Sequence, residues 1–162
     1  MSYSSYSSYY RTMNISLDQL KKLREETLAG VSDCRTALED AGGEFEKAKK
    51  LIQKRGIEKA SKKEGKETNE GVVESYVHAN GKVGVLVELT CETDFVARND
   101  EFKKLSHEIC LQVASMNPKN VTELLKSPYI RDGKYSIGDL VKMTIAKVGE
   151  NITISRFSRL SL

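Results

Sequence analysis

The sequence predicts an α+β fold, in which an N-terminal bundle of three helices precedes a linker and a small antiparallel sheet with helices on one side. Three observations lead to this prediction. Between residues 16 and 56 the apolar residues recur at helical spacing. Asn80-Gly81 separates two segments with alternating apolar residues, which is typical of a β-hairpin. A third alternating segment, residues 152–160, follows only after further helical segments, which does not resemble parallel βαβ winding.

Length and charge limit the possible classes of protein. The chain has 162 residues, which is enough for a small domain and a medium-sized one. Its formal net charge is only +3, so any contact with nucleic acid must be local. No segment approaches the run of about 20 apolar residues that crosses a membrane. We expect a protein of the cytoplasm or of an organelle matrix that has no membrane partner.

Changes in composition predict four regions along the chain. Residues 1–12 are a low-complexity run of serine and tyrosine, which indicates a disordered extension or a leader. Residues 13–57 are expected to form the helical domain. Residues 58–70 are expected to be a charged linker, whose first half could continue the third helix, and residues 71–162 a core domain.

The helical domain begins with a predicted capping box, Ser16 with Gln19. A second helix is expected from residue 32 or 33 to Ala41, and a third is expected to end at Gly56. Three helices in so short a segment form a core that is only marginally stable alone. We therefore expect a docking module rather than a catalytic domain.

The linker, E-K-A-S-K-K-E-G-K-E-T-N-E, contains almost no apolar side chain. An alternative interpretation is an RNA- or ribosome-associated protein that binds through the basic residues of this region. These residues are Lys54, Arg55, Lys59, Lys62, Lys63 and Lys66. Glutamates are interleaved with them and no aromatic residue offers a stacking surface, so a solvated linker is the simpler interpretation.

In the core domain, residues 73–77 and 83–89 are expected to pair as a hairpin through a type I′ turn at Asn80-Gly81. Asn99 is expected to cap a long helix that ends at Asn117.

A short helix is then expected at residues 121–126, followed by a turn at Asp132-Gly133. Ser136 with Asp139 is expected to open a helix that closes at Gly149, before the last strand.

No group of residues points to catalysis. The glycines form no phosphate-binding loop, so we expect no direct binding of nucleotide. Cys91 has no histidine near it in sequence, which favours a structural cysteine. His107 and Cys110 are one helical turn apart, but two ligands are too few for a metal site. We expect a binding protein without a catalytic residue, metal or cofactor.

Residues 88–100, E-L-T-C-E-T-D-F-V-A-R-N-D, connect a strand pattern to a helix pattern. Asp94 and Phe95 belong to neither periodicity, and binding groups are often carried on loops that a rigid scaffold holds. From local sequence alone, an ordinary connection with Phe95 in the core and Asp94 capping a turn is the simpler interpretation.

The segments T-D-F-V-A-R-N, L-R-E-E-T and D-C-R-T-A-L together resemble the elongation factor Ts family, over roughly residues 13–162. The resemblance implies a ubiquitin-associated-like N-terminal bundle and guanine-nucleotide exchange on elongation factor Tu. It also implies that Asp94 and Phe95 reach the partner's nucleotide domain and dislocate its magnesium. The corresponding partner-binding set is Thr93, Asp94, Phe95 and Val96.

The resemblance implies a second contact through Arg24, Val31 and Ser32. Here the chain departs from the family pattern, since Leu28 replaces a usual glycine and Val31-Ser32 replace two methionines. Because this chain has a single core, it resembles the short forms, for which two chains pair. The edge strand at residues 152–160 is the expected surface of such a homodimer.

Overall fold

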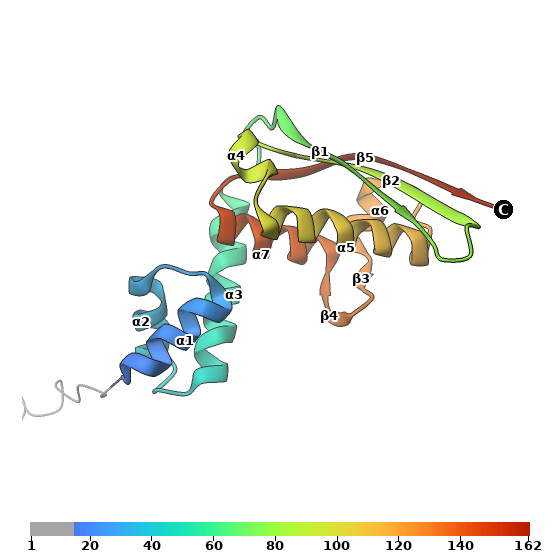
Figure 1. Cartoon of the computed structure of the whole chain (residues 1–162). Coiled ribbons are helices and arrows are strands. Elements are labelled where there is room, and N and C mark those ends of the chain that lie inside the picture. The colour runs from blue at the N-terminus through green and yellow to red at the C-terminus, as the bar shows by residue number, and fades with distance from the viewer. Residues whose placement is uncertain (1–14) are drawn as a thin grey trace, which may run out of the picture. The chain divides into compact units, whose positions relative to one another are not determined.

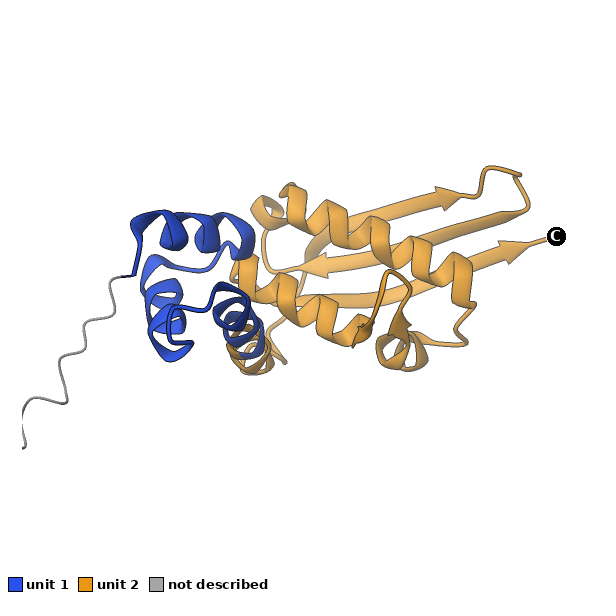
Figure 2. Cartoon of the chain, turned by 90° about the horizontal axis from the view of Figure 1, so that it is seen from below, with its two compact units in different colours: residues 1–54 blue, residues 55–162 orange. Residues whose placement is uncertain are grey.

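The computed structural model describes residues 15–162, and its chain divides into two units, residues 1–54 and 55–162 (Figure 2). The extension expected at residues 1–12 lies outside the described residues. The helices are α1 (Leu17–Thr27), α2 (Val31–Asp40), α3 (Phe45–Ser61), α4 (Asp94–Ala97), α5 (Asp100–Met116), α6 (Val121–Lys126) and α7 (Ile137–Val148). The strands are β1 (Glu70–Val77), β2 (Val83–Cys91), β3 (Pro128–Tyr129), β4 (Asp132–Ser136) and β5 (Ile152–Ser161).

The N-terminal unit packs its helices around small buried side chains. Leu23 and Leu38 are fully buried together with Cys34, Ala37 and Ala48. Such small side chains allow the helices to approach one another closely, but they bury little apolar area. The core of this unit is therefore small, as the sequence predicts.

The predicted capping box at the start of α1 does not form. The Ser16 hydroxyl accepts a hydrogen bond from Asp18 N–H at 3.2 Å. The Gln19 amide instead donates to the carbonyl oxygen of Gly43 at 3.4 Å, in the turn between α2 and α3. A tertiary contact has thus taken the side chain that the local pattern assigned to the cap.

The end of α1 is strained. Leu28 has a φ of 54°, in the left-handed region, and its N–H donates to the Arg24 carbonyl at 2.8 Å. Glycine is the usual residue at this position because a Cβ is unfavourable there. Leu28 is also half exposed, so its side chain recovers little free energy through burial.

The helix α3 continues beyond its predicted end at Gly56. A Cβ at residue 56 would lie only 2.9 Å from the Cβ of Ala146 in α7, so this glycine permits close packing between helices rather than ending one. Ala60 is buried in the core of the second unit. The first part of the expected linker is therefore helical.

The second unit confirms the predicted α+β class. Its main sheet has the antiparallel order β1-β2-β5, and α5 and α7 both lie on one face of it (Figure 1). Val85, Val87 and Leu89 of the central strand β2 are buried on that face, against a core that includes Phe102 and Ile109 of α5.

The hairpin between β1 and β2 has a longer loop than predicted. Gly81 has a φ of 69°, whereas Asn80 is not among the described residues with positive φ, so this is not a type I′ turn. The loop closes through His78, whose carbonyl accepts from Gly81 N–H at 2.7 Å and whose N–H donates to Val83 at 2.8 Å.

The remaining predicted caps are confirmed. Asn99 caps α5, Ser136 and Asp139 form the capping box of α7, and Gly149 ends that helix with a φ of 81°.

The small hairpin of β3 and β4 is attached to α5 by the buried Gln112. Its amide donates to the Pro128 carbonyl at 2.9 Å, and its side-chain oxygen accepts from a backbone N–H in the same hairpin at 3.0 Å.

None of the helices within residues 15–162 is long and apolar enough to cross a membrane.

The strain at Leu28 generates the first prediction. We expect Leu28→Gly to stabilise the N-terminal unit by about 1 kcal/mol, because glycine adopts the left-handed region without the clash of a Cβ. Hydrogen exchange of the α1 amides in the full chain would measure the change as slower opening. The control is Asn117→Gly, at a φ of 48°, since asparagine already tolerates that region. Equal or faster opening in Leu28→Gly would show that Leu28 is unstrained.

Candidate protein-binding site

The connection between β2 and α5 is a one-turn helix, α4, rather than an irregular loop. Thr93 is its N-cap, and the Thr93 hydroxyl accepts from Val96 N–H at 3.4 Å. Val96 and Ala97 point into the core, whereas Asp94 and Phe95 lie on the opposite, exposed side. Thr93, not Asp94, therefore caps this turn.

Phe95 is 85% exposed, so the interpretation that places its ring in the core is wrong. The neighbouring residues explain its direction: the turn buries Val96 and Ala97, and this leaves the preceding side chain outside. A single exposed aromatic ring on an ordered turn is well placed to fill a pocket in another protein, because aromatic side chains often dominate binding energy.

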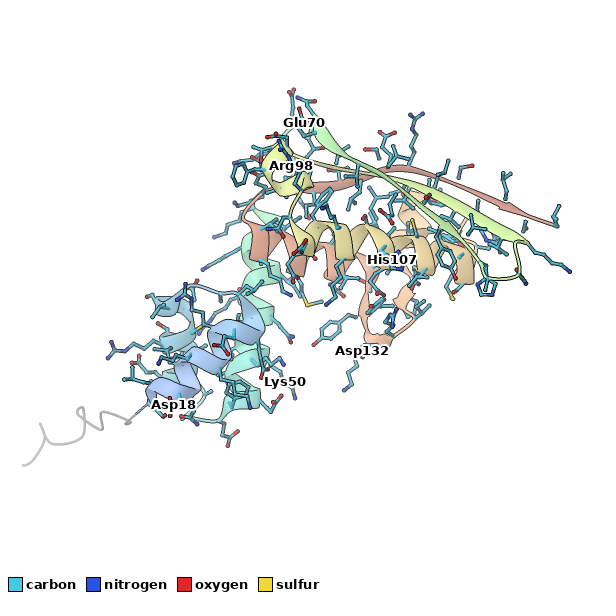
Figure 3. All side chains as sticks on the ribbon, in the orientation of Figure 1. Asp18, Lys50, Glu70, Arg98, His107 and Asp132 are labelled. Carbon is cyan, nitrogen blue, oxygen red and sulfur yellow. The ribbon has the colours of Figure 1, made fainter. Side chains whose placement is uncertain are left out.

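Asp94 lies beside this ring and forms an ion pair with Arg98, one helical turn away. Figure 3 shows Arg98, the C-cap of α4, near Glu70 at the start of β1, and α4 packs against that strand. Both charged groups of the pair are more than half exposed, so the pair contributes little to stability. The Asp94 carboxylate can therefore exchange Arg98 for a group on a partner.

Two carboxylates join this turn to the turn between α7 and β5. Glu150 accepts hydrogen bonds from the N–H of Thr93 at 3.0 Å and from its hydroxyl at 2.7 Å. Glu92 accepts from Asn151 N–H at 2.7 Å, and this bond lowers the pKa of the Glu92 carboxyl. The buried Asn151 amide donates to the Lys66 carbonyl at 2.8 Å. Nothing in the sequence indicated these contacts, because the residues that make them lie in connections without periodicity.

Cys91, at the end of β2, is a structural residue, as predicted. It is fully buried, and its thiol donates to the Thr93 carbonyl at 3.1 Å. Burial, together with the charge of Glu150, raises the pKa of this thiol to about 11. Burial likewise raises the pKa of Cys110 to about 12. Thiols with such pKa values are poor nucleophiles near neutral pH.

Val96 was predicted as a partner contact together with its neighbours, but only 8% of it is exposed. We therefore assign it to the core. Asp94 and Phe95 are the members of the predicted set with exposed side chains that point away from the unit, and Thr93 fixes the turn that carries them.

The residues predicted for the second contact gather at the junction of α1 and α2 in the N-terminal unit. Arg24 lies in the last turn of α1, and Val31 and Ser32 open α2. All three are exposed, as is Leu28 between them. This junction therefore carries both apolar and basic exposed side chains.

The basic residues of the expected linker are partly engaged within the second unit. The Lys63 ammonium donates to the Gly149 carbonyl, and Lys66 pairs with Glu92 at 3.6 Å. Glu64 pairs with Lys142 at 3.3 Å.

Within residues 15–162 there is no cluster of three potential metal ligands from histidine, cysteine, aspartate or glutamate.

The chain is similar to known proteins over nearly all of its length. A family model described as elongation factor TS matches residues 92–162. Elongation factor Ts of Fervidobacterium nodosum is 40% identical, over 93% of this chain and 99% of its own length. That of Thermotoga petrophila is 41% identical over 91% and 96%, and that of Coprothermobacter proteolyticus is 39% identical over 93% and 99%.

The match to this family model and the similarity to these relatives identify the chain as a translation elongation factor. Proteins that share only a fold can have much lower sequence identity than the 40% or so found here across almost the whole of both chains. The chain belongs to the elongation factor Ts family.

The relatives are longer within the aligned region. The alignment to the first of them extends over 195 residues, more than the 162 of this chain, although it covers 99% of that relative. Segments of the relative therefore have no counterpart here.

The buried Cys91 thiol generates a prediction about pH. Its pKa is raised from an ordinary value of 9.0 to about 11, so its contribution to stability is complete below pH 9 and is lost as pH rises toward 11. We expect the urea midpoint to fall over this interval, and to fall less steeply in Cys91→Ala. The two raised thiol pKa values should also appear as thiolate absorbance that develops only above pH 10. Thiolate absorbance near pH 9 for all the cysteines of the folded chain would contradict this.

Proposed function

We propose that this chain binds elongation factor Tu and accelerates the release of GDP from it. The observation that carries the proposal is the exposure of Phe95 on a turn whose opposite side is anchored by Val96 and Ala97. An exposed ring on an ordered support loses little conformational freedom when it enters a pocket. A factor with this role works where translation takes place, in the cytoplasm or an organelle matrix.

A physical mechanism follows from the two exposed side chains. A GTPase holds GDP through phosphate contacts and a magnesium ion. Insertion of Phe95 between elements of the partner would shift the groups that hold magnesium, and burial of such a ring supplies about 1.5–3 kcal/mol. Asp94 adds a negative charge and hydrogen-bond acceptors next to the displaced groups. Thr93 contributes by fixing the turn.

Such a factor breaks no covalent bond and is not an enzyme in that sense. It binds the nucleotide-free partner more tightly than the GDP-bound partner. Linkage then requires that the factor and the nucleotide weaken each other's binding by the same ratio. The chain itself would bind no nucleotide, and GTP would eject it from the partner.

We propose a second contact at the junction of α1 and α2, through Arg24, Val31 and Ser32. This surface combines a guanidinium, which suits carboxylates, with the exposed apolar side chains of Leu28 and Val31. Branched valine is stiffer than methionine, so this contact would be less adaptable than a methionine-rich one.

We also propose that two copies pair through the core domain. The sequence suggested the edge strand β5, but the exposed apolar residues favour the uncovered face of the main sheet. Opposite residues in the register share a face, which places Val73, Val77, Leu86 and Leu160 on the side away from α5 and α7. These four side chains are all exposed, and small residues such as Gly84 lie between them. We call them the open sheet face. The same face also carries the exposed ion pair of Glu88 with Arg156. Exposed apolar side chains with polar groups between them suit burial against a second copy of the same face.

The exchange proposal is tested by the release of a fluorescent GDP analogue from purified elongation factor Tu. We expect the parent chain to accelerate release, and Phe95→Ala to need at least about tenfold more protein for the same rate, because it loses a central aromatic anchor. Ile130→Ala is the matched control, since Ile130 is an exposed apolar residue of the β3–β4 hairpin. Equal loss in both variants would contradict the role of Phe95, and no acceleration by the parent would contradict exchange.

The pairing proposal is tested by sedimentation velocity. We expect Leu86→Lys to weaken self-association by about tenfold or more, because a charge replaces about 1.5–3 kcal/mol of apolar burial. Thr122→Lys, on the exposed side of α6, adds the same charge elsewhere and should leave association unchanged. A parent chain that sediments as a monomer at every concentration would refute the dimer.

A further inference from the structure

Glu150 binds the N-cap residue of α4 through both of its carboxylate oxygens. Both oxygens of its carboxylate accept hydrogen bonds from the same residue, one from Thr93 N–H at 3.0 Å and one from the Thr93 hydroxyl at 2.7 Å. Bonds to a carboxylate are stronger and more directional than bonds between neutral groups. Residue 93 is therefore fixed both at its backbone and at its side chain.

The position of the hydroxyl proton matters for the cap. Because this proton is donated to Glu150, the lone pairs of the Thr93 oxygen are left for the N–H of Val96, at 3.4 Å. Without the carboxylate, the hydroxyl could rotate to donate elsewhere and the cap would weaken. Glu150 thus selects the side-chain conformation in which Thr93 starts the helix.

The direction of Phe95 depends on that cap. The helix α4 has four residues, which is too few to be stable by its own hydrogen bonds. The ring of Phe95 is 85% exposed, so packing does not hold it. Only the backbone of the turn orients this ring, and the turn is held by Thr93 on one side and by the buried Val96 and Ala97 on the other.

We propose that Glu150 is a positioning residue for nucleotide exchange, which acts through Thr93 and preorganises Phe95 for entry into the partner. This inference rests on the proposed function. Glu150 itself lies after α7, in the turn that leads to β5, and reaches the site across the end of the sheet. If the turn is ordered for only a fraction of the time, the apparent affinity for the partner falls by that fraction.

The hydrogen-bond chemistry gives a graded set of variants. Glu150→Gln keeps the shape of the side chain but has only one acceptor oxygen for the two donors of Thr93. Its amide N–H₂ is itself a donor, so it cannot accept from the second one. Thr93→Val keeps the N–H and removes the hydroxyl, whereas Thr93→Ser keeps both donors. We therefore expect Glu150→Gln and Thr93→Val to loosen the turn, and Thr93→Ser to preserve it.

The first measurement is independent of exchange. In the full-length free chain, backbone order parameters from ¹⁵N relaxation should fall in Glu150→Gln from about 0.85 to below about 0.6 over residues 93–95, and stay unchanged in α5. Glu123→Gln is the matched control, because Glu123 also accepts a backbone N–H, from Lys119 at 3.3 Å, but lies on α6. An unchanged order parameter at residues 93–95 would overturn the inference even if the chain proves to be an active exchange factor.

The second measurement asks whether Glu150 acts through the ring. In the GDP-release assay we expect Glu150→Gln to raise the half-maximal concentration about three- to tenfold, with Thr93→Ser near the parent. In a Phe95→Ala background, Glu150→Gln should have little further effect, since the group that it positions is gone. An equal effect in both backgrounds would show a direct contact or a general structural role and would overturn the inference. If the parent chain has no exchange activity, the proposed function fails, and the order parameters still decide whether Glu150 orders the turn.

Discussion

The structure of the second unit depends on the burial of one face of β2. Every second residue of β2 points into the core, namely Val85, Val87, Leu89 and Cys91. A shift of one residue in the pairing register of this strand would expose all four. This constraint fixes the register with β1 and β5 on either side of β2, and it fixes where β2 ends. Because Cys91 is the last buried residue of the strand, the chain leaves the sheet at a defined point and the Asp94-Phe95 turn begins there.

The turn combines an anchored and an unanchored side. Val96 and Ala97 join the core, while Phe95 remains in water at a cost in solvation that folding does not recover. In the proposed complex, burial of the ring in the partner would recover this cost. The ion pair of Asp94 with Arg98 is similarly exposed and exchangeable. The carboxylates of Glu92 and Glu150 hold the turn without covering these two groups. The turn is therefore held firmly while the side chains of Asp94 and Phe95 stay exposed.

Much of the fold could be predicted because it depends on local patterns. The caps at Asn99 and Ser136 and the final strand follow from residue types at fixed spacing. The errors arose where tertiary contacts override local preference. Gln19 bonds to Gly43 rather than to its own cap, and Gly56 lies inside a helix because Ala146 packs against it. For the candidate site, the resemblance predicted Asp94 and Phe95, and the structure exposes both side chains. The hydrogen bonds from Thr93 to Glu150 could not be foreseen, because Glu150 is distant in sequence and nothing in its own segment marks it.

The central claim is that this chain prefers the nucleotide-free form of elongation factor Tu. The most direct test is to measure its affinity for that protein by calorimetry, with GDP and magnesium present and with the nucleotide removed. The account predicts tighter binding to the nucleotide-free form, and the ratio of the two affinities should equal the ratio by which the chain weakens GDP binding. Equal affinity for both forms would contradict the account, because a factor without differential affinity cannot shift nucleotide binding.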